Sequence, residues 1–223
     1  MDNFVDFHQL FLSLSTPEVS DALESFGVVS GLVGIRPAVA GQKIFGPAFT
    51  VAKELNSDPE YRRAADFIDQ VPEGHVVIID NLGLETCTCW GGILTLYAKQ
   101  MRLEGTVVNG MHRDAEIIRS TDYPVFSKGI FMVTGKGRTE LKDVNVPIII
   151  HDVTILPSDI IFGDDHGVVV IPAQILGDVA KRAEAARAVE HEILNLVLQH
   201  GVPLKEARER LRYSDLTRPV VPS

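Results

Sequence analysis

Arg113 and Asp114 are the adjacent side chains in this sequence best suited to binding chemistry. They follow the β-branched segment 105–110, which predicts a strand. An arginine guanidinium is a permanent cation whose planar fork suits a carboxylate. An aspartate carboxylate is a hard oxygen ligand for Mg²⁺ or Mn²⁺. The pair is compatible with a surface ion pair, but its place at a strand end favours a site that binds an anion beside a divalent cation.

Two glycines, Gly91 and Gly92, precede a helix that we expect to reach about residue 103. The first amides of a helix have no intrahelical acceptor and lie at the positive end of its dipole, so they bind carboxylates or phosphates. We expect the strands that end at Asp80 and Gly110 to deliver their loops to one sheet edge, where ligands of open α/β sheets bind.

Three predicted elements position these loops. Residues 75–80 form an uninterrupted β-branched run, which is typical of a strand covered on both faces. The helix from Gly91 and the strand over 105–110 follow it, and this order makes a β-α-β unit. A small helix over 115–120 comes next.

The remaining chain predicts one α/β domain over residues 1–223, with an N-terminal helix over about 7–26 and a short C-terminal tail over about 213–223. No repeat, low-complexity tract or long linker divides it. Helices and strands are expected in several further segments. These are helices over 61–70 and 173–200, short strands within 31–51, and strands over 124–126, 146–150 and 168–171.

Composition limits the partners of the protein. The 223 residues carry 21 basic and 30 acidic side chains, a net charge of −9, which argues against a general surface for nucleic acid or anionic membranes. The start of the chain lacks the pattern of a signal peptide and no apolar run approaches the ~20 residues of a membrane span, so we expect a cytoplasmic protein. Cys87 and Cys89 are expected to be reduced.

Several blocks of the sequence, in the same order, resemble the RraA-like / 4-hydroxy-4-methyl-2-oxoglutarate aldolase family (class II pyruvate aldolase-like). The similarity extends from about residue 16 to residue 206. The blocks are 46–51, 90–94, 107–114, 124–126 and 163–172. This resemblance implies a compact swivelling β/β/α sandwich. It also implies a homotrimer or homohexamer with active sites between subunits.

The resemblance assigns roles to the residues singled out above. Arg113 matches the arginine that binds the carboxylate and carbonyl of the substrate, and Asp114 matches the ligand of Mg²⁺ or Mn²⁺. A neighbouring subunit would add a carboxylate from its C-terminal helix, either Glu190 or Glu192, acting on the metal through water. The backbone amides of one segment would hold the pyruvyl carboxylate. That segment is Trp90, Gly91, Gly92, Ile93 and Leu94.

One position departs from the family pattern. The aldolases carry an acidic residue twenty-one positions before the arginine, and Gly92 stands there in this chain. Acid–base help of this kind is worth about 10²–10⁴-fold. His112 is the replacement to test first, because the ordinary pKa of histidine suits proton transfer near neutral pH. Glu85 and Asp80 are further candidates.

The leading hypothesis is a divalent-metal-dependent lyase that acts on a 2-oxo acid through a metal-stabilised pyruvate enolate. The reaction would be retro-aldol cleavage of a 4-hydroxy-2-oxo acid, decarboxylation of an oxaloacetate-like acid, or both. No lysine stands out as a Schiff-base former, because Lys99 lies within a predicted helix and Lys128 and Lys136 lie in turns. One alternative is a non-catalytic regulator that binds a ribonuclease or another protein. A further alternative is a biosynthetic decarboxylase, hydratase or isomerase with the same site.

Overall fold

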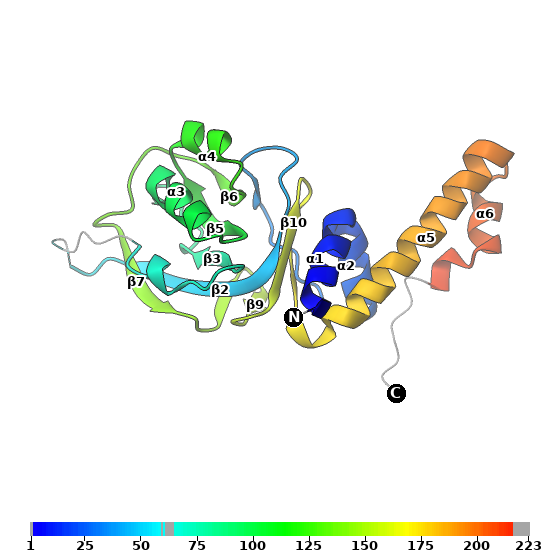
Figure 1. The fold of residues 1–223 in the computed structure, drawn as a ribbon, viewed down its shortest axis with the longest axis horizontal. Coiled ribbons are helices and arrows are strands. Elements are labelled where there is room, and N and C mark those ends of the chain that lie inside the picture. Colours follow the sequence, from blue (N-terminus) through cyan, green and yellow to red (C-terminus); the bar gives the residue numbers. More distant parts are fainter. Residues whose placement is uncertain (1, 59, 61–64, 216–223) are drawn as a thin grey trace. The chain divides into compact units, whose positions relative to one another are not determined.

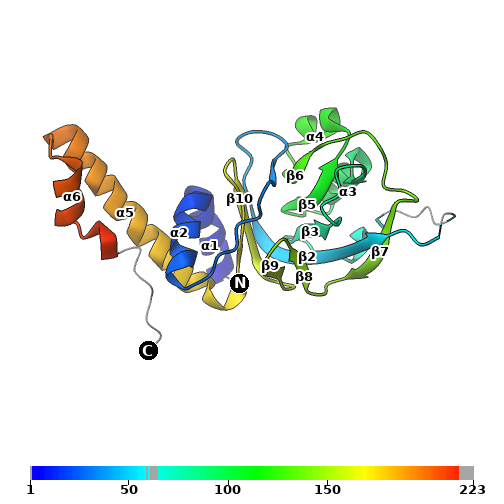
Figure 2. The ribbon, with the colours of Figure 1, turned by 180° about the vertical axis from the view of Figure 1, so that it is seen from behind.

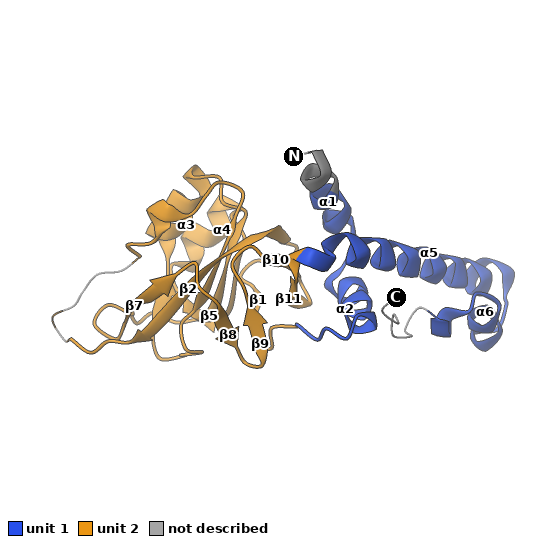
Figure 3. Ribbon diagram, turned by 90° about the horizontal axis from the view of Figure 1, so that it is seen from below, with its two compact units in different colours: residues 1–30, 174–223 blue, residues 31–173 orange. Residues whose placement is uncertain are grey.

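The computed structural model describes residues 2–58, 60 and 65–215. Its contacts divide the chain into two compact units, coloured separately in Figure 3. Unit 1 combines residues 1–30 with 174–223, and unit 2 comprises residues 31–173. The sequence predicted one domain over residues 1–223. We describe each unit by itself.

Unit 2 is built on a mixed sheet in the order β1-β6-β5-β3-β2-β10-β11, with β4 paired to β5 and β7 paired to β2. The pairs β2–β3, β3–β5, β4–β5 and β5–β6 are parallel. A separate hairpin joins β8 to β9. The strands are β1 Arg36–Pro37, β2 Ile44–Leu55, β3 Val76–Asp80, β4 Thr88–Trp90, β5 Gly105–His112, β6 Val125–Ile130, β7 Thr139–Val144, β8 Ile148–Ile150, β9 Val153–Ile155, β10 Ile160–Asp164 and β11 Gly167–Ile171.

The central strands bury both of their faces, as the apolar run at residues 75–80 predicted. In β3, Val76 and Ile78 belong to one core cluster, whereas Val77 and Ile79 belong to a second cluster. This division follows from the period of two in a strand, which sends successive side chains to opposite faces. The sheet therefore has a packed core on each side.

Helices α3 (Gly92–Gln100) and α4 (Ala115–Thr121) lie next to each other on one face of this sheet, as Figures 1 and 2 show. Ala98 of α3 and Ile118 of α4 pack in the same core cluster as Val77 and Ile79 of β3. The predicted β-α-β unit is thus formed by β3, α3 and β5. It brings the starts of both helices to the same edge of the sheet.

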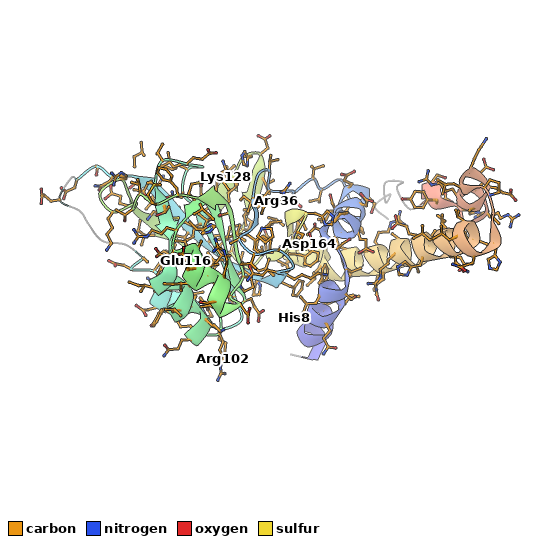
Figure 4. The ribbon with its side chains drawn as sticks, turned by 90° about the horizontal axis from the view of Figure 1, so that it is seen from above. His8, Arg36, Arg102, Glu116, Lys128 and Asp164 are labelled. Carbon is orange, nitrogen blue, oxygen red and sulfur yellow. The ribbon has the colours of Figure 1, made fainter. Side chains whose placement is uncertain are left out.

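β2 is one strand of 12 residues rather than the short strands expected within 31–51. Its length reflects three partners. Residues 44–47 pair with β10, residues 48–52 with β3, and residues 51–55 with β7. β7 and β10 were not predicted from the sequence. Asp164, labelled in Figure 4, ends β10, and its Oδ1 accepts the His166 amide at 2.9 Å in the tight turn to β11.

The prediction of a helix over 61–70 is wrong for the residues of this range that the structure describes. Residues 61–64 lie outside the described residues, and only a short 3-10 helix, η1 (Ile68–Gln70), follows them. The apolar side chains of Phe67, Ile68 and Val71 are buried in a core cluster nonetheless. Apolar spacing alone therefore indicated burial here but not helix.

Unit 1 contains α1 (Asp2–Ser13), α2 (Thr16–Ser25), α5 (Leu176–His200) and α6 (Leu204–Arg210), with two 3-10 helices, η2 (Ala173–Ile175) at its border and η3 (Tyr213–Asp215). The helix expected over about 7–26 is two helices. A new helix begins because the Glu18 carboxylate accepts the Ser15 amide at 2.6 Å in a capping box. α5 matches the expected long helix and ends at Gly201, which has a positive φ of 65°. Among the described residues, no helix is long and apolar enough to cross a membrane.

Candidate active site

A cavity of about 180 Å³ opens in unit 2 at the carboxyl ends of β3, β4 and β5. It joins the two loops that the sequence analysis singled out, because Arg113 and Asp114 line it together with the segment from Trp90 to Leu94. The rest of its wall includes polar groups from β2 and from the segment before β7. The additional lining residues are Lys53, Ala65, Phe67, Ile79, Thr88, Cys89, Thr134, Gly135, Lys136 and Thr139.

β4 and β5 fix the two loops against each other. The strands pair in parallel, and beyond the last pair the Arg113 amide donates to the Trp90 carbonyl at 3.1 Å. Asp114 then adopts a left-handed conformation with φ 59° and ψ 47° and begins α4. Aspartate tolerates this conformation better than most residues. The turn places the Asp114 carboxylate at the start of α3.

Asp114 caps α3 from outside that helix. Its Oδ2 accepts the Gly92 amide at 2.8 Å and lies 3.7 Å from Nε of Arg113. The amide of Gly92, predicted to hold a substrate carboxylate, therefore binds a carboxylate of the protein itself. The Ile93 and Leu94 amides, also in the first turn of the helix, are left to anchor a ligand. Oδ1 of Asp114 accepts no hydrogen bond from any described residue.

A side chain at either glycine would force a neighbouring side chain to move. A Cβ atom on Gly91 would lie 2.7 Å from Asp114 Oδ2, and a Cβ atom on Gly92 would lie 2.4 Å from Cδ1 of Ile117. Real Cβ atoms do not approach other heavy atoms this closely. The position that carries an acid in the aldolases thus has no room for a side chain here unless Ile117 moves.

Trp90 forms a wall of the cavity and offers it no hydrogen-bond donor. The side chain is buried, and its Nε1 donates to Oγ1 of Thr95 at 2.9 Å. Its ring stacks on that of Tyr123 with centroids 6.4 Å apart. Trp90 was predicted to belong to the segment whose backbone amides bind the substrate. Its indole ring instead packs in the wall beside that segment.

His112 does not line the cavity, contrary to its predicted part in proton transfer. It is the last residue of β5, and its ring lies buried with Nδ1 hydrogen-bonded to Oγ of Ser127 at 2.7 Å. Burial and the nearby Arg119 guanidinium lower the pKa of His112. The structure therefore separates two residues that are neighbours in sequence, because β5 ends at His112 and Arg113 lies in the turn beyond it.

The two other replacements considered for the acid at position 92 also lie outside the cavity lining. Asp80 closes the turn after β3, where its Oδ1 accepts the Leu82 amide at 3.0 Å and Nδ2 of Asn109 at 2.8 Å. Glu85 is exposed in the loop before β4. Neither side chain is placed to exchange a proton with a ligand in the cavity.

The predicted carboxylates of the C-terminal helix lie on α5 in unit 1, whereas every cavity residue belongs to unit 2. Oε1 of Glu190 accepts the Tyr213 hydroxyl at 2.9 Å, and this hydrogen bond raises the pKa of Tyr213. Glu192 is exposed. Their action on a neighbouring subunit stays a prediction.

Lys53 is a cavity residue that the sequence analysis missed. It lies on β2 with only 8% of its surface exposed, and it lines the cavity together with the half-buried Cys89. The signal was the strand period: Phe49 and Val51 are buried on one face of β2, and Lys53 continues their alternation. Both cysteines are free, as expected.

Asp114 is suited to a Mg²⁺ site in which a single protein carboxylate binds the ion. Among the described residues no group of three or more histidine, cysteine or acidic side chains is arranged to hold a metal ion. Mg²⁺ is commonly held by one or two carboxylates and completes its shell with water and substrate oxygens. Asp114 lines the cavity, and its Oδ1, a hard oxygen that accepts no hydrogen bond from the described residues, meets that requirement.

Comparison with known proteins assigns the chain to a protein family. A sequence model of the RraA-like family, described as Aldolase/RraA, matches residues 16–170. The chain belongs to the RraA-like family. Its fold is the mixed α/β sandwich of that family. The crystal structure of an uncharacterised protein from Pseudomonas syringae pv. tomato matches it with a TM-score of 0.83 and 38% identity, and the match covers 93% of this chain and 98% of that one.

Two relatives bear names, and a further structure extends the likeness in fold. Protein DlpA of Legionella pneumophila is 41% identical over 214 residues, which are 95% of this chain and 35% of DlpA, so the chain spans about a third of that relative's length. A Halalkalibacterium halodurans protein named as a 4-hydroxy-4-methyl-2-oxoglutarate aldolase is 30% identical to this chain. The match covers 82% of this chain and 85% of that protein. Streptomyces coelicolor RraAS2, described as an unusual member of the RNase ES inhibitor RraA family, shares the fold with a TM-score of 0.76 at 24% identity, over 83% of this chain and 94% of that one.

Proposed function

We propose that this RraA-like chain is a lyase that cleaves a 2-oxo acid, by retro-aldol cleavage of a 4-hydroxy-2-oxo acid or decarboxylation of an oxaloacetate-like acid. One observation carries the proposal. Arg113, Asp114 and the first turn of α3 line a single cavity, and the Arg113 guanidinium donates no hydrogen bond to any described residue. A cation fork, a hard anion and helix amides together suit the carboxylate and carbonyl of a 2-oxo acid. The relative named as an aldolase supports the same reaction class.

The chain's own residues bind and orient the substrate in this proposal. The Arg113 fork pairs with substrate oxygens, and the amides of Ile93 and Leu94 anchor the carboxylate. Asp114, with Oδ2 fixed by the Gly92 amide, presents Oδ1 to a divalent cation. Mg²⁺ or Mn²⁺ bound there would act as a Lewis acid on the carbonyl of the 2-oxo acid. Phe67, Ile79 and Trp90 give the cavity apolar walls, against which the carbon chain of the substrate would pack.

A homotrimer or homohexamer is part of the proposal. In such an assembly Glu190 or Glu192 from a neighbouring subunit would complete the site through water. Variants Glu190→Gln and Glu192→Gln test this, and only the one that reaches the site should lower activity. Size determination by light scattering on the same samples separates a catalytic loss from a loss of assembly.

The experiment that tests the lyase is an assay of pyruvate release from oxaloacetate and from 4-hydroxy-2-oxo acids, with Mg²⁺, with Mn²⁺ and with EDTA. We expect release that EDTA abolishes and that either cation restores. Pyruvate release that EDTA does not affect would show that the reaction needs no divalent metal ion. No release from any of these acids would remove the lyase itself.

A second candidate, a regulator that binds a ribonuclease or another protein, is favoured by one contact. Ile117 fills the space that an acidic side chain at Gly92 would need. The net charge of −9 suits a basic partner segment. Inhibition of a ribonuclease by a chain without lyase activity would support this function, and a fully active lyase that leaves the ribonuclease unaffected would exclude it.

A further inference from the structure

Lys53 is a largely buried lysine that lines the cavity, and its ammonium group has no partner among the described residues. The residue is only 8% exposed, and among the described residues it forms no hydrogen bond or ion pair. Burying a charged group without a partner is costly, so structures retain one only where something compensates for it. A ligand bound in the cavity that Lys53 lines would supply such compensation.

The surroundings of Lys53 favour a proton-exchanging amine over a fixed cation. Burial lowers the pKa of Lys53, and the nearby Cys89, Cys87 and Glu140 oppose this only in part. Burial also raises the pKa of Cys89 to about 12, so this thiol is neutral near pH 7 and opposes the lowering of the Lys53 pKa only at high pH, where it ionises. Other charged groups of the cavity wall come from two loops, the turn between β5 and α4 and the loop before β7. They are Arg113, Asp114 and Lys136.

Resting on the lyase proposed above, we propose that Lys53 is the acid–base residue of this site and replaces the carboxylate that Gly92 lacks. The neutral amine takes the proton of the C4 hydroxyl group of a 4-hydroxy-2-oxo acid. The C3–C4 bond breaks, C4 becomes a carbonyl, and the electron pair passes to the pyruvate half. The ammonium then returns the same proton to C3, which gives pyruvate and a free amine.

No other described side chain of the cavity suits this role as well. His112, Asp80 and Glu85 do not line the cavity. Asp114 holds the start of α3, and Arg113 keeps its proton at any physiological pH. Lys136 lines the cavity but is exposed, so water solvates its charged form.

The kinetic test compares Lys53→Met and Lys53→Arg with Lys142→Met, an exposed lysine outside the cavity lining. We expect both Lys53 variants to lose roughly 10²–10⁴-fold in kcat with little change in KM. In the unaltered protein kcat/KM should fall as the pH drops through the pKa of Lys53, and the Met variant should lack that fall. A Lys53→Arg variant with full kcat would overturn the proposal, because arginine supplies charge but no free amine.

A second measurement does not depend on activity. Lysines are dimethylated with ¹³C-formaldehyde, and the Lys53 signal is identified by its loss in Lys53→Arg. We expect it to titrate at a lower pH than the signals of exposed lysines. Oxalate with Mg²⁺ should raise that pKa, because a bound anion favours the charged amine. A Lys53 signal that oxalate binding leaves unmoved would overturn the proposal even in an active lyase. A signal that moves in a protein inactive on all 2-oxo acids would reject the lyase and keep Lys53 as an anion-binding group.

Discussion

The carboxylate of Asp114 accepts the backbone amide of Gly92 at 2.8 Å, and this bond ties the start of α4 to the start of α3. One oxygen of Asp114 is thereby committed to the fold, while the other remains at the cavity. The residue predicted as a metal ligand thus also has a structural role. Its two roles can be separated by substitution.

Asp114→Asn should preserve folding and remove the metal-dependent activity. Asparagine keeps an oxygen that can accept the Gly92 amide, and it tolerates the positive φ of 59° at this position. Asp114→Ala should lose about 0.5–2 kcal/mol from the missing cap, and about 1 kcal/mol more from the left-handed backbone. Urea denaturation gives both stabilities, and pyruvate release gives the activity. Equal stability of the two variants would contradict the capping role.

Restoring a carboxylate at position 92 requires space from Ile117. Gly92→Asp alone should cost about 1–3 kcal/mol, because overpacked side chains strain their surroundings. Gly92→Asp combined with Ile117→Ala relieves the contact that a Cβ atom would make with Ile117 Cδ1 at 2.4 Å. In a Lys53→Met background this pair should recover part of the lost kcat. The matched control is Ile117→Ala with Lys53→Met, and recovery in that control would disprove the explanation.

Arg113→Lys should weaken binding of oxalate by roughly 10–100-fold, which corresponds to loss of about 1.5–3 kcal/mol from a charged hydrogen bond. A lysine keeps the charge but lacks the planar fork that pairs with two carboxylate oxygens. Isothermal titration calorimetry with oxalate and Mg²⁺ measures the change. Arg138→Lys, at an exposed arginine outside the cavity lining, is the control and should bind as the unaltered chain does.

His112 should make the protein less stable in mild acid. Because burial lowers its pKa below the ordinary value of 6.5, the unfolded chain takes up a proton at a higher pH than the folded chain. The free energy of unfolding therefore falls as the pH drops through 6.5 toward the pKa of the folded state. This contribution is fully present above 6.5. Urea denaturation from about pH 8 to about pH 5 measures the slope.

His112→Asn should reduce this slope, since asparagine does not titrate. The matched control is His151→Asn, because His151 is exposed and its φ of 53° suits asparagine. The control should keep the slope of the unaltered protein. An unchanged slope in His112→Asn would show that other groups cause the loss in acid.

Local sequence patterns determined those parts of the fold that depend only on residues close together in the chain. The run at residues 75–80, the glycines before α3 and the strand before Arg113 specify a β-α-β unit, because strand period, helix start and turn chemistry are local properties. Two loops of one sheet edge followed from that unit, and both line the cavity. β10 was missed because turn residues flank it, and its burial comes from pairing with β2 and β11.

Tertiary structure alone decided which side chains face the cavity. His112 and Arg113 are adjacent in sequence, yet only Arg113 lines it, because the direction of a side chain at a strand end depends on local backbone rotation. Lys53 is sixty residues from Arg113 in sequence and shares the cavity with it through the pairing of β2 with β3 and of β3 with β5. Asp114 was predicted from the sequence among the thirty acidic side chains, whereas the hydrogen bond of its carboxylate with the Gly92 amide is decided by packing. Contacts between residues distant in the chain depend on pairing and packing, and sequence spacing does not encode either one.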